Sequence, residues 1–208
     1  MNKQLTPVEI IDVEQGTDEW LRARMGIPTA SMFSAVMAKG NQGGESLTRR
    51  KYMLQLAGER LTGNPMEKYT NDDMERGKEQ EPMALAQYQF DKDVEVQRVG
   101  FIRCGRAGCS PDGLVGEDGM VEFKSAAAHI LIDIHLRKRM PPEHLPQCAG
   151  GLWVAQRRWI DLVIYCPGLP SYVERIPREE GYISEIAGAI GIFNRELDDV
   201  VKFMEKVT

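Results

Sequence analysis

The chain has 208 residues, enough to bury one core of packed helices and strands, and its 42% hydrophobic and 27% charged residues are ordinary for a globular protein. A formal net charge of −5 argues against a protein that coats nucleic acid, because such proteins neutralise many phosphates. No apolar run approaches the length of a membrane span, and residues 1–15 lack the basic and then apolar order of a signal peptide. We therefore expect a single domain over residues 1–208 that works inside the cell, without a membrane partner.

Neither the cysteines nor the histidines are spaced like metal ligands. The four cysteines form no C-x-x-C pair and have no partner histidine nearby, which favours reduced, mostly buried thiols over a zinc site. The histidines have no acidic residue or cysteine at a ligand spacing, and we expect structural or surface roles for His129, His135 and His144.

Helical signals dominate residues 17–90. The stretch TDEWLRARMG begins with Thr17 as a candidate N-cap, carries acidic residues in its first turn and stops at Gly26, which predicts a short helix. A second helix is predicted over residues 29–40, with Thr29 or Ser31 as its cap. Leucines seven residues apart predict a third helix over residues 46–63, and helical character continues over residues 71–90.

The pattern changes to that of strands after residue 94. Apolar and polar residues alternate over residues 94–104, and this stretch predicts at least four strands together with residues 121–125, 159–166 and 171–176. Two helices are predicted between the second and third of these strands, at residues 128–140 and 144–156, and a long amphipathic helix over about 178–206 closes the chain. This order predicts an α/β (α+β) fold, with a mixed central β-sheet flanked by helices.

The stretch CSPDGLVGEDGMVEFKS, residues 109–125, combines a hairpin pattern with charges that a core strand would not carry. Glu122 and Lys124 project from one face of a strand, while Val121 and Phe123 pack behind them. Asp112 precedes a hairpin loop that can bring it beside Glu122. Buried carboxylates repel each other unless a cation neutralises them, and oxygen ligands suit Mg²⁺ or Mn²⁺. The pattern thus predicts a metal site whose lysine holds or deprotonates a water, or stabilises charge on a phosphate.

The same residues also have a plainer interpretation. A Glu-x-Lys pair on a strand is most often a solvated ion pair, and acidic hairpins are common at protein surfaces. The complete string SPDG followed by EFK, with RGKEQE upstream and HLPQCAGGLW downstream, favours the metal site over this alternative.

In this order, the motifs resemble the phage lambda exonuclease and YqaJ-type viral recombinase family, a branch of the PD-(D/E)xK nuclease superfamily. The resemblance extends from about Trp20 to Tyr165 and implies a restriction-endonuclease-like core. It also implies the site residues. The metal would be held by Asp112, Glu122, Glu81 of RGKEQE and the main-chain carbonyl of Phe123, and catalysis would further use Lys124 and Gln147, the glutamine to orient the lysine or the scissile phosphate.

The segment WLRARMGIPTAS resembles the part of this family that grips a 5′-phosphorylated DNA end. This resemblance implies that Arg24 and Ser31 bind substrate and that Ser110 assists through its hydroxyl. Arginine suits this role because its charge-assisted hydrogen bonds to a phosphate are strong and directional.

Two positions depart from the family pattern. Gly151 stands where many relatives have a tyrosine, four residues after the glutamine. Pro82 directly follows Glu81, which requires that glutamate to lie near a helix start or in a kink. In such a place Glu81 could turn toward the site, or it could be an exposed first-turn residue.

The resemblance implies a Mg²⁺-dependent enzyme, with Mn²⁺ as a substitute, that digests one strand of double-stranded DNA from a 5′-phosphate end. Its products would be 5′-mononucleotides and a 3′ single strand for recombination by strand annealing. The resemblance further implies a ring-shaped homotrimer, a single-strand-annealing partner protein, and a place in the cytoplasm of a bacterium or a phage-infected host cell. Two alternatives remain open: a structure- or sequence-selective endonuclease on the same fold, and a non-catalytic binding module that keeps the motif.

Overall fold

The computed structural model describes residues 6–40, 44, 46–66 and 72–207 of the chain. Its helices are α1 (Asp18–Arg24), η1 (Ala30–Met32), α2 (Phe33–Met37), α3 (Leu47–Thr62), α4 (Asp72–Lys92), α5 (Ala128–Arg137), η3 (Pro142–His144), α6 (Leu145–Ala155) and α7 (Glu180–Met204). Its strands are β1 (Val8–Ile11), β2 (Val96–Gln97), β3 (Phe101–Cys104), β4 (Ala107–Cys109), β5 (Gly113–Val115), β6 (Gly119–Ser125), β7 (Trp159–Tyr165) and β8 (Tyr172–Pro177).

The described strands form a larger and a smaller sheet. The larger has five strands in the order β2-β5-β6-β7-β8, and the smaller has three in the order β1-β3-β4. Strands β6 and β7 are parallel, whereas the other pairs are antiparallel. Parallel neighbours need a long crossover, which α5 and α6 supply. The predicted mixed sheet flanked by helices is confirmed, and the smaller sheet is an addition that the sequence pattern does not predict.

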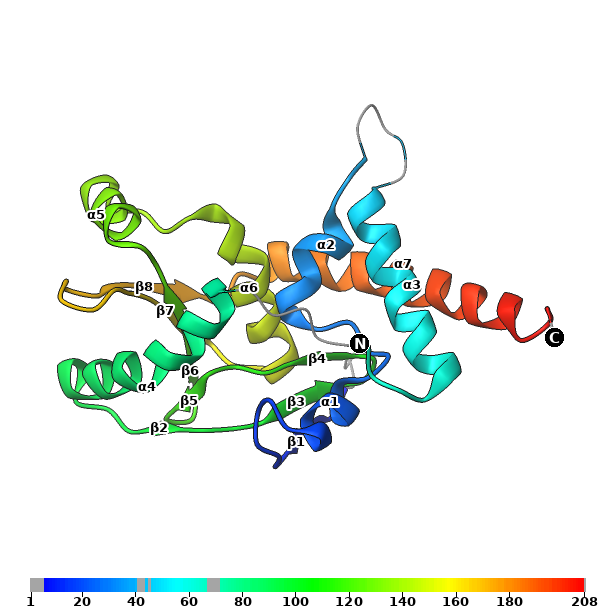
Figure 1. Cartoon of the computed structure of the whole chain (residues 1–208), viewed down its shortest axis with the longest axis horizontal. Helices are drawn as coiled ribbons and strands as arrows, with labels where there is room; N and C mark the ends of the chain where they lie inside the picture. Colours follow the sequence, from blue (N-terminus) through cyan, green and yellow to red (C-terminus); the bar gives the residue numbers. More distant parts are fainter. Residues whose placement is uncertain (1–5, 41–43, 45, 67–71, 208) are drawn as a thin grey trace.

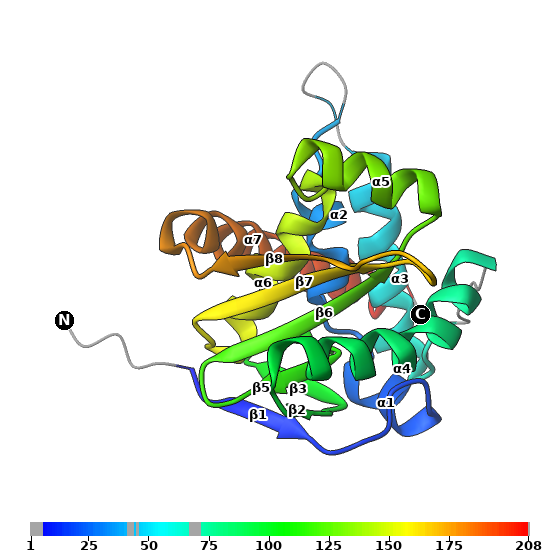
Figure 2. The same cartoon turned by 90° about the vertical axis from the view of Figure 1, so that its left-hand side faces the viewer.

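Helices cover both faces of the larger sheet. On one face, α4 packs through Ala84 and Tyr88 against Val121, Phe123 and Val163. On the other face, α6 lies against β3, β4 and β7, with α2 and α7 packed behind it. Figure 1 shows α4 and α5 at one end of the molecule, and α3 with α7 at the other. Figure 2 shows strands β5 to β8 between α4 on one side and α6 with α7 on the other.

Capping residues account for the bounds of two helices. The Thr17 hydroxyl accepts a hydrogen bond from the backbone N–H of Trp20 at 3.3 Å, so the predicted N-cap of α1 is confirmed. Ser46 caps α3 in the same way, through the N–H of Arg49. Gly63 ends α3 in the left-handed conformation, with φ of 67°, which glycine adopts without steric cost.

The structure of residues 94–104 differs from the single strand that the sequence predicts. They form β2 and β3, which belong to different sheets. The chain crosses between the sheets at Gly100, where it passes the backbone of Val13 so closely that an added Cβ would lie 1.9 Å from the Val13 carbonyl oxygen. The predicted helix over residues 29–40 is also shorter, because η1 and α2 together end at Met37. Thr29 precedes η1 but makes no capping hydrogen bond through its side chain.

Helix α4 determines whether Glu81 lies at a helix start or within the helix. The helix continues through Pro82, so Glu81 lies in its interior, and the alternative of a first-turn residue is wrong. A proline inside a helix removes one backbone hydrogen-bond donor, and the packing of Ala84 and Tyr88 against β6 offsets that loss. Asn71, the first residue of the predicted helix, lies outside the described residues.

Two further expectations concern the whole chain. The four cysteines are unpaired thiols, as predicted, and three of them are buried. Within the described part of the chain, no helix is long and apolar enough to cross a membrane.

Candidate active site

The β5–β6 hairpin places the two predicted carboxylates next to each other. Gly113, the first residue of β5, pairs with Val121, so Asp112 lies opposite the position of Glu122. The ladder between these strands does not extend beyond Val121. There, Asp112 Oδ2 accepts a hydrogen bond from the backbone N–H of Phe123 at 2.6 Å. The hairpin geometry predicted from the sequence is therefore confirmed.

Glu122 is the centre of a hydrogen-bond network. Its side chain is buried, and its Oε1 accepts hydrogen bonds from Lys124 Nζ, at 2.8 Å, and from Gln147 Nε2. Gln147 lies in the first turn of α6, a helix with a proline at its start. Lys124 and Gln147 are thus linked through one carboxylate oxygen of Glu122.

The burial of these charges changes their protonation. Burial raises the pKa of Asp112 well above its usual range, and the nearby carboxylates of Glu122 and Glu81 raise it further. Burial alone would lower the pKa of Lys124, but Glu122 and Asp112 outweigh burial and the net change is upward. Lys124 is therefore protonated at neutral pH, and a cation bound between the carboxylates would relieve their repulsion.

A pH-dependent difference in stability should follow from the raised pKa of Asp112. A carboxyl group with a raised folded pKa stabilises the protein below its usual pKa and loses that contribution as the pH rises through the folded pKa. In the presence of a chelator, the free energy of unfolding of the wild type should therefore fall, relative to that of Asp112→Asn, as the pH rises from about 4. Urea unfolding at a series of pH values measures this difference, and a constant difference would contradict it. Added Mg²⁺ should reverse the trend for the wild type, because metal binding needs the deprotonated carboxylate.

Glu81 approaches the site from α4. Its carboxylate forms an ion pair with Arg98, at 2.5 Å between Oε1 and Nη1. Its charge still raises the pKa of Asp112, so the two carboxylates lie within electrostatic reach of each other. Among the described residues, no three Asp, Glu, His or Cys side chains converge in an arrangement that could hold a metal ion. The fold thus makes neighbours of Asp112 and Glu122 and leaves Glu81 paired with an arginine.

The predicted substrate-binding residues line the same cavity as Glu122, Lys124 and Gln147. This cavity has a volume of about 290 Å³ and is formed by α1, η1, β6, α6 and the segment before β5. Gly151, the departure from the family pattern, also lines it and adds no side chain to its wall. Its lining includes Arg24, Ser31, Ser110, Glu122, Lys124 and Gln147.

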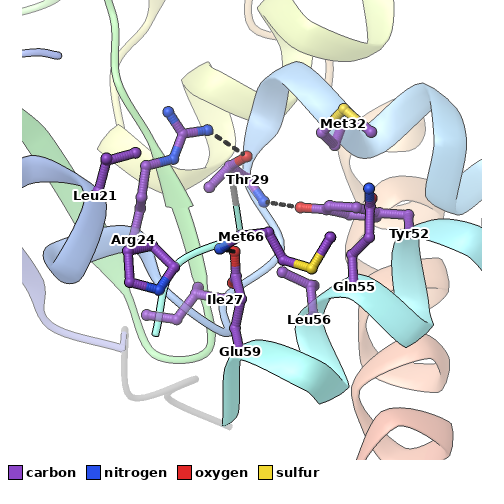
Figure 3. Close-up of a pocket in the computed structure, with 11 residues that line it drawn as sticks. Leu21, Arg24, Ile27, Thr29, Met32, Tyr52, Gln55, Leu56, Glu59 and Met66 are labelled. Atoms are coloured by element: carbon purple, nitrogen blue, oxygen red, sulfur yellow. Dashed lines mark hydrogen bonds between the residues drawn. The ribbon is translucent and has the colours of Figure 1, made fainter. Parts of the chain in front are cut away.

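Arg24 is a half-buried cation. Its guanidinium lies over the ring of Trp20, 4.1 Å from the ring centroid. Its Nη2 donates to Thr29 Oγ1 at 3.2 Å (Figure 3). Burial lowers the pKa of Arg24, against the smaller opposing effects of Tyr52 and Glu59. No carboxylate of the described residues forms an ion pair with this arginine. A half-buried cation without such a partner suits an anionic ligand.

Sequence reasoning missed Gln15, which shapes this cavity from a distance in the chain. The Gln15 amide lines it and donates to the carbonyl oxygens of Val99 and Pro111, both at 2.9 Å. Gln15 thereby holds the segment that leads to Asp112. No local motif identifies Gln15, because it acts through neighbours far away in the sequence. His144, expected to be structural or on the surface, is not among the residues that line the cavity, and its pKa is lowered by burial and then by the charge of Lys124.

A family model and two solved structures match most of this chain. The sequence matches the model of the YqaJ-like viral recombinase domain over residues 19–158. The structure resembles an alkaline exonuclease, LHK-Exo, from Laribacter hongkongensis, at 32% sequence identity and a TM-score of 0.82, over 91% of this chain and 97% of that chain. LHK-Exo in complex with dAMP gives a TM-score of 0.83 at the same identity and coverage.

A more distant structure shares the fold alone. It is a phage related exonuclease from Haemophilus somnus 129PT, with 15% identity and a TM-score of 0.68 over 86% of this chain and 96% of that chain. The search among curated proteins found no match. The domain match covers well over half of the chain and includes every predicted catalytic residue. The chain therefore belongs to the YqaJ-like viral recombinase family.

Proposed function

We propose that this protein is a Mg²⁺-dependent exonuclease that digests one strand of double-stranded DNA in the 5′→3′ direction. It would release 5′-mononucleotides and leave a 3′ single-stranded overhang for recombination by strand annealing. Family membership and the similarity to structures named as exonucleases support a DNA nuclease. The direction of digestion rests on the cavity.

One observation carries the assignment of a 5′-phosphate end. Arg24, a half-buried arginine without a carboxylate ion pair among the described residues, lines the same cavity as Glu122 and Lys124. Two serine hydroxyls, those of Ser31 and Ser110, line it as well. An arginine with two hydroxyl donors suits a terminal phosphate. The distance between the bound terminal phosphate and the carboxylates would then determine which phosphodiester is cut.

The acidic residues fit a magnesium ion. Asp112 and Glu122 are neighbouring carboxylates, and the pKa of Asp112 is raised by burial and by the adjacent charges, a cost that a bound cation would remove. The N–H and C=O of one strand residue point to the same edge. Because the N–H of Phe123 faces Asp112, its carbonyl is expected on that edge as a further ligand. Glu81 would join by releasing Arg98. Bound there, Mg²⁺ would polarise the scissile phosphate and help to ionise a water.

Lys124 and Gln147 would act on the attacking water and the phosphate. Glu122 and Asp112 outweigh burial and raise the pKa of Lys124, so the protonated lysine can donate to a water or to the phosphate oxygens as negative charge develops on them. Gln147 and Lys124 both donate to Glu122 Oε1, which fixes the positions of the two donors relative to each other. The rigid arrangement favours in-line displacement at one phosphorus, because the reacting groups are held in place before the reaction.

Arg24→Ala tests the proposed direction of digestion. Loss of a charge-assisted hydrogen bond to phosphate should lower the preference for a 5′-phosphorylated duplex over a 5′-hydroxyl duplex by about ten- to a hundredfold, which corresponds to roughly 1.5–3 kcal/mol. The measurement is kcat/KM on two linear duplexes that differ only in that phosphate.

Arg22→Ala is the matched control, because Arg22 is an exposed arginine on the same helix and should leave the preference unchanged. If wild type and Arg24→Ala discriminate equally well between the two ends, Arg24 does not anchor the phosphate. If the wild type shows no preference and also cuts covalently closed duplexes, the endonuclease alternative replaces the exonuclease.

The quaternary proposals rest on the family resemblance. A ring-shaped homotrimer around DNA would let a chain with a net charge of −5 hold its substrate by enclosure, and a single-strand-annealing protein would receive the 3′ strand. Processive digestion by such a ring should tolerate added salt better than binding to an open surface does, because escape requires more than counterion exchange. Light scattering under conditions of activity tests the assembly, and a stable monomer would exclude it.

A further inference from the structure

Thr29 lies between Arg24 and Ser31, two residues that we propose to bind the 5′-phosphate. Its side chain is buried, with 4% of the residue exposed. Its Oγ1 accepts a hydrogen bond from Arg24 Nη2 at 3.2 Å and lies 3.4 Å from Ser31 Oγ. One hydroxyl therefore contacts both the proposed anchoring arginine and the proposed anchoring serine.

The hydrogen-bonding capacity of the Thr29 hydroxyl allows an arrangement that frees Ser31 to donate. Thr29 has one hydrogen to donate, and its oxygen accepts from Arg24. Either hydroxyl can donate in the contact with Ser31, and when Thr29 donates, the Ser31 oxygen accepts. Ser31 then keeps its own hydrogen for a ligand, and a phosphate, which only accepts hydrogen bonds when ionised, is the complementary group.

Trp20 does the same for Ser110. Trp20 Nε1 donates to Ser110 Oγ at 2.9 Å, which leaves the serine hydrogen for donation into the cavity. The same indole ring lies beneath the guanidinium of Arg24. With Thr29 and Trp20 as their partners, Arg24, Ser31 and Ser110 can all donate into the cavity toward an anion.

Helix α3 holds Thr29 in place. The backbone N–H of Thr29 donates to the hydroxyl oxygen of Tyr52 at 3.1 Å, and Figure 3 shows the chain of contacts from Tyr52 through Thr29 to Arg24. Three residues before Thr29, the same loop is bound at Gly26: its N–H donates to Glu59 and its carbonyl accepts from Arg60 Nε. The loop between α1 and η1 is therefore attached to α3 at both ends, which limits the positions open to the Thr29 hydroxyl.

We propose that Thr29 is a positioning residue for recognition of the 5′-phosphate, whose hydroxyl orients Arg24 and makes Ser31 a donor toward the phosphate. This inference rests on the proposed function, because it assigns a second layer of residues to the same phosphate-binding cavity. Thr29 itself does not touch the phosphate; it determines how selectively the cavity distinguishes a phosphorylated end from a hydroxyl end.

The test compares Thr29→Val with Thr29→Ser. Valine keeps the branched shape and removes the hydroxyl, whereas serine keeps the hydroxyl. We expect Thr29→Val to reduce the ratio of kcat/KM on 5′-phosphate and 5′-hydroxyl duplexes by about five- to tenfold, mainly through KM for the phosphorylated duplex, because a misplaced donor loses much of a charged hydrogen bond. Thr29→Ser should keep the ratio within about twofold of wild type. The ratio is independent of how much enzyme folds, since misfolding lowers both rates equally.

Two results would overturn the inference: a wild-type ratio in Thr29→Val, including equal slowing on both duplexes, or an equal loss of the ratio in Thr29→Ser. Should the valine variant fail to fold, Thr29→Ala gives the same comparison. A wild-type enzyme without any preference for the phosphate refutes the proposed function and this inference together. A wild type that prefers the phosphate, with an unaffected Thr29→Val, refutes this inference alone.

Discussion

Asp112→Asn should abolish digestion of linear duplex DNA without unfolding the protein. Asparagine can still accept the hydrogen bond from the Phe123 N–H, so the hairpin keeps its local support. It cannot supply the negative charge that binds Mg²⁺, and loss of several kcal/mol of transition-state stabilisation corresponds to about a thousandfold or more in rate. The metal-free variant should melt at or above the wild-type temperature, because one of the repelling carboxylates is gone.

Asp118→Asn is the matched control for this variant. Asp118 lies in the turn of the same hairpin, where its half-exposed carboxylate pairs with Arg158. Its neutralisation should change neither the digestion rate nor the stabilisation by Mg²⁺, because an exposed ion pair contributes under about 1 kcal/mol. Near-normal digestion by Asp112→Asn would falsify the assignment of the metal site.

Lys124→Ala should abolish most of the digestion while Mg²⁺ binding survives. The lysine is a protonated donor at the site, and removal of one such donor typically costs about 10²–10³-fold in rate. The carboxylates of Asp112 and Glu122 remain, and the loss of a competing cation leaves them available to the metal. Calorimetric titration with Mg²⁺ and single-turnover digestion, measured on the same preparation, separate binding from catalysis.

Lys202→Ala provides a control for loss of a lysine, because Lys202 is exposed near the end of α7. It should bind Mg²⁺ and digest DNA like the wild type. Simultaneous loss of Mg²⁺ binding and digestion in Lys124→Ala would count against the role proposed for Lys124. In that event, the lysine would be a structural partner of Glu122, as the plain ion-pair interpretation of the strand holds.

The local arrangement of Asp112, Glu122 and Lys124 was available from the sequence alone. Strand periodicity puts Glu122 and Lys124 on one face, and the short hairpin loop puts Asp112 opposite Glu122. The structure confirms both, because these relations depend only on neighbours within one hairpin. Most helices were predictable for the same reason, since their caps and apolar spacing are local signals.

The long-range features were decided by tertiary packing. The stretch 94–104 reads as one alternating strand, yet it serves two sheets, because the crossing at Gly100 depends on the approach of Val13. The position of Glu81 in the interior of α4 depends on contacts of that helix with β6, which outweigh the proline that follows it.

The contacts around Arg24 show the same division. The sequence by itself determined the chemical groups of the site, because a carboxylate, an ammonium or a guanidinium is a property of the residue type. Only the tertiary structure placed Thr29 between Arg24 and Ser31 and brought Tyr52 from another helix to hold it. Hydrogen bonds between residues far apart in the chain have no periodic signature, since they depend on how helices and loops pack, and no local pattern records that packing.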